Sequence, residues 1–431
     1  GSVAKNMINT FFFQLNKIKS GASRPKGIPK NITAKLGIIG AGMMGQGIAY
    51  VSAKAGISVV LKDMTADLAQ KGKAYSERLL NKQVSSNRLT EEKSAEILQL
   101  ITPTADDTDL DGCDLIIEAV FENIELKNEI VRTNEKFVAE HGFWGSNTST
   151  LPITMLSEAS EKPERFVGIH FFSPVDKMPL IEIITGKKTS DEALAKAFDF
   201  AQQIGKTPIV VNDSLGFFTS RTFSTYCDEG ARLLVEGIHP IKIENLGKAI
   251  GMPVGPLQVQ DEVSLELSRK VSETWEAMGF ADKWGCGDTQ RRVVKDLITD
   301  NGRGGRHHGG GYYEYNQDGT KNIWPGLYEL YYDEHAVIRD DDIKDRLMFR
   351  QVIETLKCYE TGVLTSVADG NIGSIMGIGA PVHTGGFLQF VNTYGLKSFI
   401  GRCGELADEY GDRFMCPEVV KQKVISGEHF N

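Results

Sequence analysis

The sequence predicts an α/β domain built on a largely parallel sheet, followed by two related all-α domains. Three observations lead to this prediction. Between residues 35 and 211, short runs rich in β-forming residues alternate with amphipathic helical stretches, which is the pattern of a parallel sheet covered by helices. Beyond residue 216 the strand signal fades, and helical patterns continue to the C-terminus. Within that helical half, one pattern of residues occurs twice.

The composition is typical of a multidomain globular protein. Its 431 residues, of which 41% are hydrophobic, are enough for a large core. A net charge of −9 argues against nucleic-acid binding, because phosphate backbones are held by clustered Lys and Arg. Charges interrupt every apolar run before it reaches the roughly 18 residues that a membrane-spanning helix needs. We therefore expect neither a nucleic-acid partner nor a membrane span.

The cysteines are scattered, without a Cys-x-x-Cys pair or any other metal-ligand spacing, so we expect no metal site. They are predicted to be reduced, buried thiols: Cys113, Cys227, Cys286, Cys358, Cys403 and Cys416. Reduced thiols suit a reducing compartment. We favour a bacterial cytoplasm, with a mitochondrial matrix as the alternative.

Residues 1–30 are predicted to form a helix and a linker. Five apolar residues recur at helical spacing: Ile8, Phe11, Phe12, Leu15 and Ile18. The following residues 20–29 are rich in glycine, proline and small polar residues, which oppose regular structure. The chain opens on Gly-Ser without an initiator Met, as a cloning remnant would. We expect the helix to pack on the body of the protein or to belong to a domain upstream.

The domain predicted over residues 31–215 begins with a glycine motif. A strand over residues 36–39 leads into Gly40-Ala41-Gly42-Met43-Met44-Gly45, and a helical pattern follows. Gly40 permits a tight turn, Gly42 lets the backbone approach a pyrophosphate, and Gly45 allows close packing of helix on sheet. The phosphate would then lie at the positive N-terminus of the helix. This context predicts a Rossmann-type dinucleotide-binding domain.

The second strand of this domain, over residues 57–61, leads to Asp63. An acid at this place accepts hydrogen bonds from the adenosine ribose and repels a 2′-phosphate, so the predicted cofactor is NAD rather than NADP. Further strands are predicted over residues 115–120, 166–169, 180–184 and 208–211. The alternative to a cofactor site is a glycine-rich turn in an α/β protein that binds no dinucleotide.

Polar residues that could perform chemistry stand among apolar strands in two places. One is the segment Ser146–Thr150, and the other joins His170, at the end of one strand, to Glu182 within the next. A charged Glu inside an apolar strand needs a partner. A His that takes a proton from a substrate hydroxyl, oriented by a carboxylate, is an established acid/base device. The alternative is a buried ion pair with a structural role only.

The repeat in the helical half has an offset of about 125 to 128 residues. Residues 229–238, followed by a Gly-Met-Pro sequence at 251–253, resemble residues 354–363, followed by Gly-Ala-Pro at 379–381. We therefore predict two helical domains, over residues 216–320 and 321–431. The alternative is that unrelated helices share the same glycine and proline punctuation.

Several motifs in this order resemble the L-3-hydroxyacyl-coenzyme A (CoA) dehydrogenases over about residues 35–431. They are the glycine motif with Asp63, Glu118–Asn123, Ser146–Ser149, His170–Pro174, Gly205–Pro208 and Asp213–Phe217. The duplicated helical domain and the preceding linker resemble the dehydrogenase portion of multifunctional β-oxidation α-subunits. In those proteins an enoyl-CoA hydratase domain precedes the linker. We expect this chain to be a fragment without that domain.

The resemblance implies the roles of individual residues and the partners of the chain. The NAD site would be lined by Met44, Asp63, Val120, Phe121, Glu122 and Lys127. Ser149 would contact both the nicotinamide and the hydroxyl of a 3-hydroxyacyl-CoA substrate, His170 would be the general base, and Glu182 would be its partner. In the intact enzyme, a thiolase β-subunit would bind the α-subunit.

Three positions depart from the family pattern. Ser173 and Ser220 stand where the family commonly has Asn, and His307 stands where it often has Lys. We assign Ser173 to the cofactor site and Ser220 to the catalytic site, although Ser lacks the two donors of a carboxamide. His307 and His308 are predicted to be exposed loop residues. Two alternatives follow: a dehydrogenase for another 3-hydroxy acid, and an NAD-binding protein with weak or lost activity.

Overall fold

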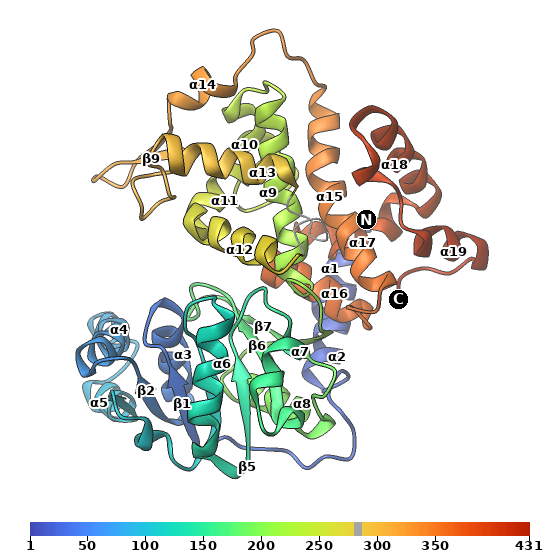
Figure 1. The fold of residues 1–431 in the computed structure, drawn as a ribbon. Coiled ribbons are helices and arrows are strands. Elements are labelled where there is room, and N and C mark those ends of the chain that lie inside the picture. The colour runs from blue at the N-terminus through green and yellow to red at the C-terminus, as the bar shows by residue number, and fades with distance from the viewer. Residues whose placement is uncertain (280–286) are drawn as a thin grey trace. The chain divides into compact units, whose positions relative to one another are not determined.

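The computed structural model describes residues 1–279 and 287–431, which form two compact units (Figure 1). The sheet unit is Gln14–Phe217. The helical unit is Gly1–Phe13 together with Phe218–Asn431. Among the predicted thiols, Cys286 lies outside the described residues, four others are buried, and Cys416 is half-buried rather than buried.

Eight strands form the sheet, in the spatial order β3-β2-β1-β4-β5-β6-β7-β8. Their bounds are β1 Lys35–Ile39, β2 Ser58–Lys62, β3 Ile101–Thr104, β4 Cys113–Glu118, β5 Val138–Ser146, β6 Phe166–Phe171, β7 Leu180–Thr185 and β8 Thr207–Asn212. Only the pair β6–β7 is antiparallel, so the predicted largely parallel sheet is confirmed. The strand order reverses between β1 and β4, and α/β sheets bind ligands beyond the carboxyl ends of such a pair.

Two of these strands lack the continuous apolar run that predicts a strand. β3 has only four residues and includes Pro103, and β5 passes through the exposed Glu140 and His141 before its buried end. Both strands pair in parallel with a neighbour, β3 with β2 and β5 with β4. Sheet pairing, rather than local sequence preference, therefore defines them.

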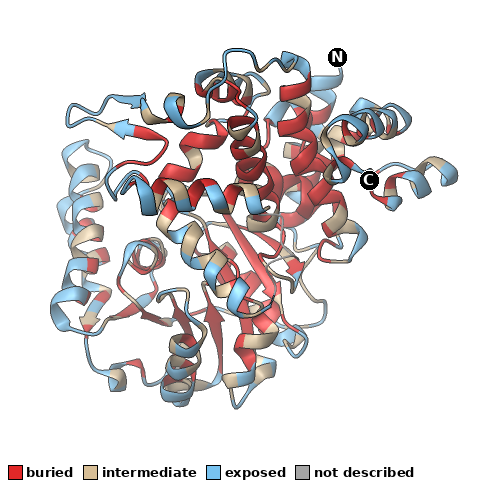
Figure 2. Ribbon diagram, turned by 45° about the horizontal axis from the view of Figure 1, so that its top comes forward, coloured by how far each residue is buried: buried red, intermediate tan, exposed pale blue. Residues whose placement is uncertain are grey.

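The core of the sheet unit forms where strands meet the helices that cover them. Ile38, Leu61, Ile117 and Ile183, from four different strands, are fully buried, and Phe198 of a covering helix joins the same cluster. Figure 2 shows the strands buried along most of their length. The α-helices of this unit are α2 Leu15–Lys19, α3 Met43–Lys54, α4 Ala66–Ser85, α5 Glu91–Gln99, α6 Ile124–Asn134, α7 Ile153–Leu156 and α8 Asp191–Gln203.

The helical unit is organised around two long buried helices that pack on each other, α9 Thr219–Val235 and α15 Asp340–Glu360. A short hairpin, β9 Tyr313–Tyr315 with β10 Lys321–Ile323, interrupts the helices. The remaining helices are α10 Pro240–Ala249, α11 Pro256–Val263, α12 Leu265–Ala277, α13 Asp288–Lys295, α14 Gly326–Tyr331, α16 Val367–Gly373, α17 Phe387–Tyr394, α18 Leu396–Tyr410 and α19 Glu418–Ser426. The predicted helical second half is confirmed.

Residues at matching positions of the predicted repeat make reciprocal ion pairs. Arg221 of α9 pairs with Glu354 of α15, and Arg346 of α15 pairs with Glu229 of α9 through Nε at 2.7 Å. In the second pair, both side chains are fully buried. The two arginines and the two glutamates are each about 125 residues apart, the offset of the repeat.

The loops in the second part of the repeat also make reciprocal contacts with each other. A Cβ on Gly251 would lie 2.9 Å from Pro381, and a Cβ on Gly379 would lie 2.9 Å from Pro253. The proline of each copy therefore packs against the glycine of the other copy. Contacts that repeat with exchanged partners are characteristic of two like units around a local two-fold axis. They support the repeat, whose boundary between residues 320 and 321 stays a prediction.

The N-terminal helical segment exists as predicted, over α1 Ser2–Met7, a π-helical turn at Ile8–Gln14 and α2 Leu15–Lys19. The predicted apolar residues of this segment differ in burial. Ile8 and Phe12 are 55% and 62% exposed, whereas the polar Asn6 and Thr10 are buried. Thr10 donates a hydrogen bond to the Gly385 carbonyl at 2.7 Å, and Asn6 donates one to the Thr393 hydroxyl at 3.0 Å. Specific hydrogen bonds therefore orient the start of this segment, where Ile8 and Phe12 are exposed, whereas Ile18 near its end is fully buried.

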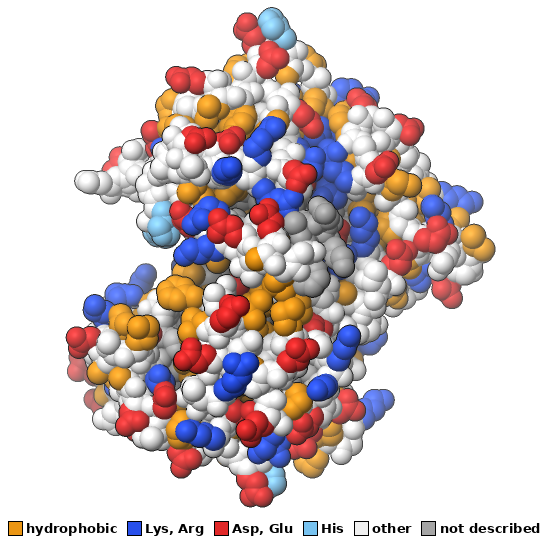
Figure 3. Space-filling view, viewed as in Figure 1, with side chains coloured by type: hydrophobic (Ala, Val, Ile, Leu, Met, Phe, Trp, Pro, Cys, Tyr) orange, Lys and Arg blue, Asp and Glu red, His pale blue; other side chains and the backbone are white. Residues whose placement is uncertain are grey.

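Two further observations concern the hydropathy of the helices and the charge of the surface. No helix within residues 1–279 and 287–431 has the length and hydropathy of a membrane-spanning segment. On the face in Figure 3, acidic and basic side chains are interspersed over the sheet unit.

Candidate active site

The glycine turn between β1 and α3 has the geometry that its sequence predicts. Gly40 has a φ of 101°, and a Cβ there would lie 2.6 Å from the Ala119 carbonyl oxygen. A Cβ on Gly45 would overlap the Gly40 carbonyl oxygen. Gly42 caps α3, is exposed, and would direct a Cβ into open space. No side chain caps this helix N-terminus, so the space above Gly42 fits a pyrophosphate.

Asp63 lies directly after β2 and is bonded to the glycine turn. Its Oδ2 accepts the Ala41 N–H at 2.7 Å, and its Oδ1 accepts the Met64 N–H at 2.7 Å. Each carboxylate oxygen has a second lone pair that can accept a ribose hydroxyl. Lys62 pairs instead with Asp107 at 2.8 Å. The residues present therefore fit the adenosine end of NAD.

Glu122 organises the loop that carries Ser149. Its Oε1 accepts hydrogen bonds from the Thr148 hydroxyl at 2.6 Å, from the Ser149 N–H at 3.1 Å, and from both the N–H and the hydroxyl of Thr150 at 3.1 and 3.0 Å. Burial alone would raise the pKa of Glu122, but Lys127 and the threonine hydroxyls lower it. Glu122 is therefore ionised at neutral pH.

Lys127 is buried between two carboxylates. Its Nζ lies 3.0 and 2.9 Å from the two oxygens of Glu118 and 3.3 Å from Glu122. Burial would lower the pKa of Lys127, but the two glutamates raise it. Glu118 also accepts a short hydrogen bond from the Ser146 hydroxyl. The predicted cofactor residue Lys127 thus holds Glu122, and through it the Ser149 loop.

His170 and Glu182 face each other across the antiparallel strands β6 and β7. The register pairs them directly, and His170 Nδ1 lies 2.9 Å from Glu182 Oε2. Both side chains are buried. Because a carboxylate accepts a hydrogen bond, Nδ1 carries the proton and Nε2 keeps a free lone pair. The pair can therefore take up a proton at Nε2.

Asn147 holds the end of β5 beside the strand of His170. Its Oδ1 accepts the Phe171 N–H at 2.9 Å, and Phe171 is the residue after His170. The rings of Phe172 and Phe217 lie 4.5 and 6.2 Å from the imidazole ring. Sequence reasoning included Asn147 in a motif but assigned it no role. Only the tertiary contact shows that it links two polar segments.

The other predicted site residues lie in three places. Met44 and the loop residues Val120 and Phe121 follow β1 and β4, and Phe121 is 80% exposed. Ser173 is exposed, with its hydroxyl 3.8 Å from the Met43 sulfur. Ser220 belongs to α9 of the helical unit, so its catalytic role stays a prediction.

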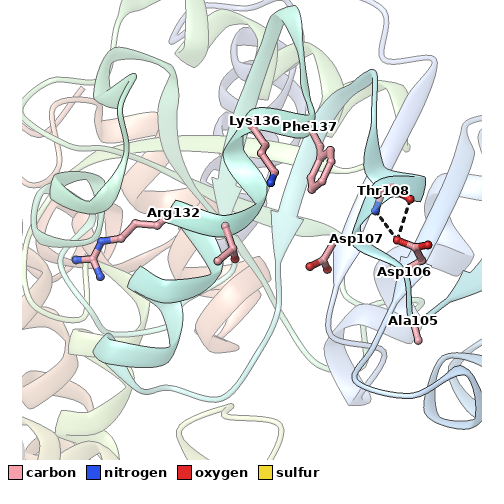
Figure 4. Close-up of a pocket in the computed structure, with 8 residues that line it drawn as sticks. Ala105, Asp106, Asp107, Thr108, Arg132, Lys136 and Phe137 are labelled. Atoms are coloured by element: carbon pink, nitrogen blue, oxygen red, sulfur yellow. Dashed lines mark hydrogen bonds between the residues drawn. The ribbon is translucent and has the colours of Figure 1, made fainter.

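The described residues contain no group of three or more His, Cys, Asp or Glu side chains that could hold a metal ion. His307 and His308 are exposed loop residues, as predicted. An open pocket of 940 Å³ lies elsewhere on the sheet unit, lined in part by Asp106, Arg132 and Lys136 (Figure 4). None of the predicted site residues lines it.

Comparison with known proteins shows which family this chain resembles. The family model for the NAD-binding domain of 3-hydroxyacyl-CoA dehydrogenases matches residues 35–214, and the model for their C-terminal domain matches residues 216–315. The chain is 34% identical to the fatty acid oxidation complex subunit alpha of Shewanella amazonensis over 98% of its own length. It spans 60% of the length of that relative.

Two solved structures of 3-hydroxybutyryl-CoA dehydrogenases are also similar to this chain. The (S)-3-hydroxybutyryl-CoA dehydrogenase of Ralstonia eutropha is 33% identical, with a TM-score of 0.60, over 66% of this chain and the whole of that protein. The 3-hydroxybutyryl-CoA dehydrogenase of Escherichia coli K12 has a TM-score of 0.77 at 22% identity, over 92% of this chain and all of that one. The second likeness establishes the fold alone.

Proposed function

This chain belongs to the 3-hydroxyacyl-CoA dehydrogenase family and is an NAD-dependent oxidoreductase, and we propose that Ser149, His170 and Glu182 catalyse the oxidation of the 3-hydroxyl of an L-3-hydroxyacyl-CoA by NAD+. The product is a 3-oxoacyl-CoA. The observation that carries this assignment is the buried pair of His170 and Glu182, joined at 2.9 Å.

His170 accepts the proton of the substrate hydroxyl at Nε2. Glu182 holds the Nδ1–H, which fixes the tautomer, and its negative charge stabilises the imidazolium that forms. Burial strengthens this interaction, because few water molecules screen the two charges. Bound NAD+ supplies the hydride acceptor.

Ser149 positions the substrate oxygen. Its backbone N–H is held by Glu122 at 3.1 Å, so the loop is fixed before the substrate arrives. Its hydroxyl donates to Glu122 Oε1 at 3.4 Å, and by turning away it can donate instead to the reacting oxygen, which aligns the carbon–hydrogen bond that breaks. Ser220 of α9 is also proposed as a catalytic residue. Its hydroxyl offers one donor, where a carboxamide offers two.

Steady-state turnover tests the proposal. With NAD+ and L-3-hydroxyacyl-CoA substrates, the chain should form NADH, whereas free 3-hydroxy acids without the thioester should not react. His170→Ala should lower kcat by about 10²- to 10⁴-fold and leave NAD affinity within about twofold. His141→Ala, at an exposed position of the same unit, is the control. Near-parent turnover of His170→Ala, or activity on free acids alone, would contradict the proposal.

We also propose that the complete protein works in fatty acid β-oxidation with a partner subunit. The relative from Shewanella amazonensis is named as a subunit of a fatty acid oxidation complex, which supports both statements. The motif resemblance implies a thiolase β-subunit as the partner and a bacterial cytoplasm as the location. Sedimentation of the complete protein mixed with a purified thiolase would test the assembly, because only a complex sediments faster than either component.

A further inference from the structure

The segment Asp213–Phe217, which follows β8, contacts both polar elements of the proposed site. It stood out in the sequence as a motif, yet the reaction assigns it no role. The division between the two units falls directly after Phe217. The segment is therefore the last part of the sheet unit before the chain enters the helical unit.

Asp213 holds the chain that follows Ser149. Its Oδ1 accepts the Ile153 N–H at 2.8 Å, and its Oδ2 accepts the Thr154 N–H at 2.8 Å. Two residues of backbone, 151 and 152, separate these bonds from the Ser149–Thr150 loop. Gly216 adds a third tie, because its N–H donates to the Thr150 carbonyl at 2.9 Å. The Ser149 loop is thus held by Glu122 on one side and by this segment on the other.

Phe217 reaches the other polar element. Its side chain is fully buried, and its ring centroid lies 6.2 Å from that of His170. Its backbone has a φ of 53°, in the left-handed region that side chains other than glycine rarely adopt. Such a conformation persists only where the surroundings hold it. Here the Phe217 N–H donates to the Ser214 carbonyl at 3.1 Å, which closes the segment on itself.

We propose that Asp213 and Phe217 are positioning residues, which set the Ser149 loop and the His170 ring from one short segment. This inference rests on the proposed function of Ser149 and His170. Neither residue exchanges a proton with substrate. Asp213 fixes the backbone that presents the Ser149 hydroxyl, and the ring of Phe217 limits the orientations of the imidazole. Both act on one catalytic step, so their loss should lower kcat.

Two variants with matched controls test the proposal. Asp213→Ala should lower kcat by about ten- to a hundredfold, since small misplacements of catalytic groups are costly, and Asp213→Asn should recover part of the loss. Phe217→Leu should lower kcat by about five- to twentyfold for the same reason. The controls are Asp199→Ala and Phe200→Leu, which remove a buried carboxylate and a buried ring on α8. They should cost stability with little change in kcat.

Two measurements do not depend on turnover. In Asp213→Ala, amide hydrogen exchange over residues 148–154 should rise at least severalfold relative to Asp199→Ala. In Phe217→Leu, diethyl pyrocarbonate should modify His170 severalfold faster than in Phe200→Leu. If the parent chain oxidises no 3-hydroxyacyl-CoA, the proposed function fails, while these two measurements still decide the positioning. Variants whose kcat, exchange and modification match the controls would overturn the inference.

Discussion

At the scale of single residues, the site depends on one buried cation. Lys127 lies between Glu118 and Glu122, and a neutral replacement leaves these two carboxylates without the cation that balances their charge. Lys127→Met should therefore lower the free energy of unfolding by about 3–5 kcal/mol. Thermal unfolding monitored by circular dichroism measures this.

A double variant tests whether the loss comes from the unpaired charge. Glu118→Gln combined with Lys127→Met removes one carboxylate together with the cation, so it should be more stable than Lys127→Met alone. If the double variant were less stable than the parent by the sum of the losses measured in Glu118→Gln and Lys127→Met, the two residues would contribute to stability independently.

Asp63 is predicted to make the chain prefer NAD to NADP. Asp63→Ser removes a carboxylate that holds Ala41 and that can accept the ribose hydroxyls. NAD affinity should fall about tenfold, which corresponds to about 1.4 kcal/mol, and the preference over NADP should narrow because the repulsion of a 2′-phosphate disappears. Titration of both dinucleotides gives the two affinities. Asp67→Ser, at an exposed position nearby, serves as the control. NADP binding to the parent as tightly as NAD would contradict the assignment.

At the scale of elements, the pairing of α9 with α15 makes stability depend on pH. Burial alone would raise the pKa of Glu229, but Arg413 and Arg346 lower it to about 2. Because the folded-state pKa lies below the ordinary value of 4.5, this group stabilises the protein above pH 4.5. That stabilisation, roughly 3 kcal/mol, is lost as the pH falls from about 4.5 toward about 2.

Urea unfolding between about pH 6 and pH 3 measures this dependence. Glu229→Gln does not titrate, so its stability should change less steeply with acid than that of the parent. Glu266→Gln, at a partly exposed position on α12, should keep the slope of the parent. Equal slopes for the parent and Glu229→Gln would show that Glu229 is not the group responsible.

The elements also show what the sequence can and cannot predict. The glycine turn follows from a local motif between a strand and a helix. The pair of His170 with Glu182 follows from two neighbouring strands that a short return brings together. The orientation of the N-terminal helix does not follow from such local patterns. Asn6 finds its partner Thr393 at a separation of 387 residues, and no local periodicity contains that information. The roles of Asn147 and Asp213 were missed for the same reason, since each depends on backbone groups of a distant segment.

At the scale of the whole molecule, family membership and geometry support the same reaction by separate routes. The two family models together cover residues 35–315 almost without interruption. The site residues of the sheet unit lie within the first of these ranges, and Ser220 lies within the second. Residues 316–431 carry the second copy of the predicted repeat, which packs on the first copy through α15 and α9.

The exchanged contacts of α9 and α15 have a consequence for how the molecule responds to dilution. Surfaces that pair in this way between separate chains obey mass action, so they come apart when the chains become scarce. Here both surfaces belong to one polypeptide, and their local concentration is fixed by the covalent chain. The unfolding temperature of the helical unit should therefore be the same over about a hundredfold range of protein concentration, as differential scanning calorimetry can measure. A midpoint that rises with concentration would place the stabilising contact between molecules instead.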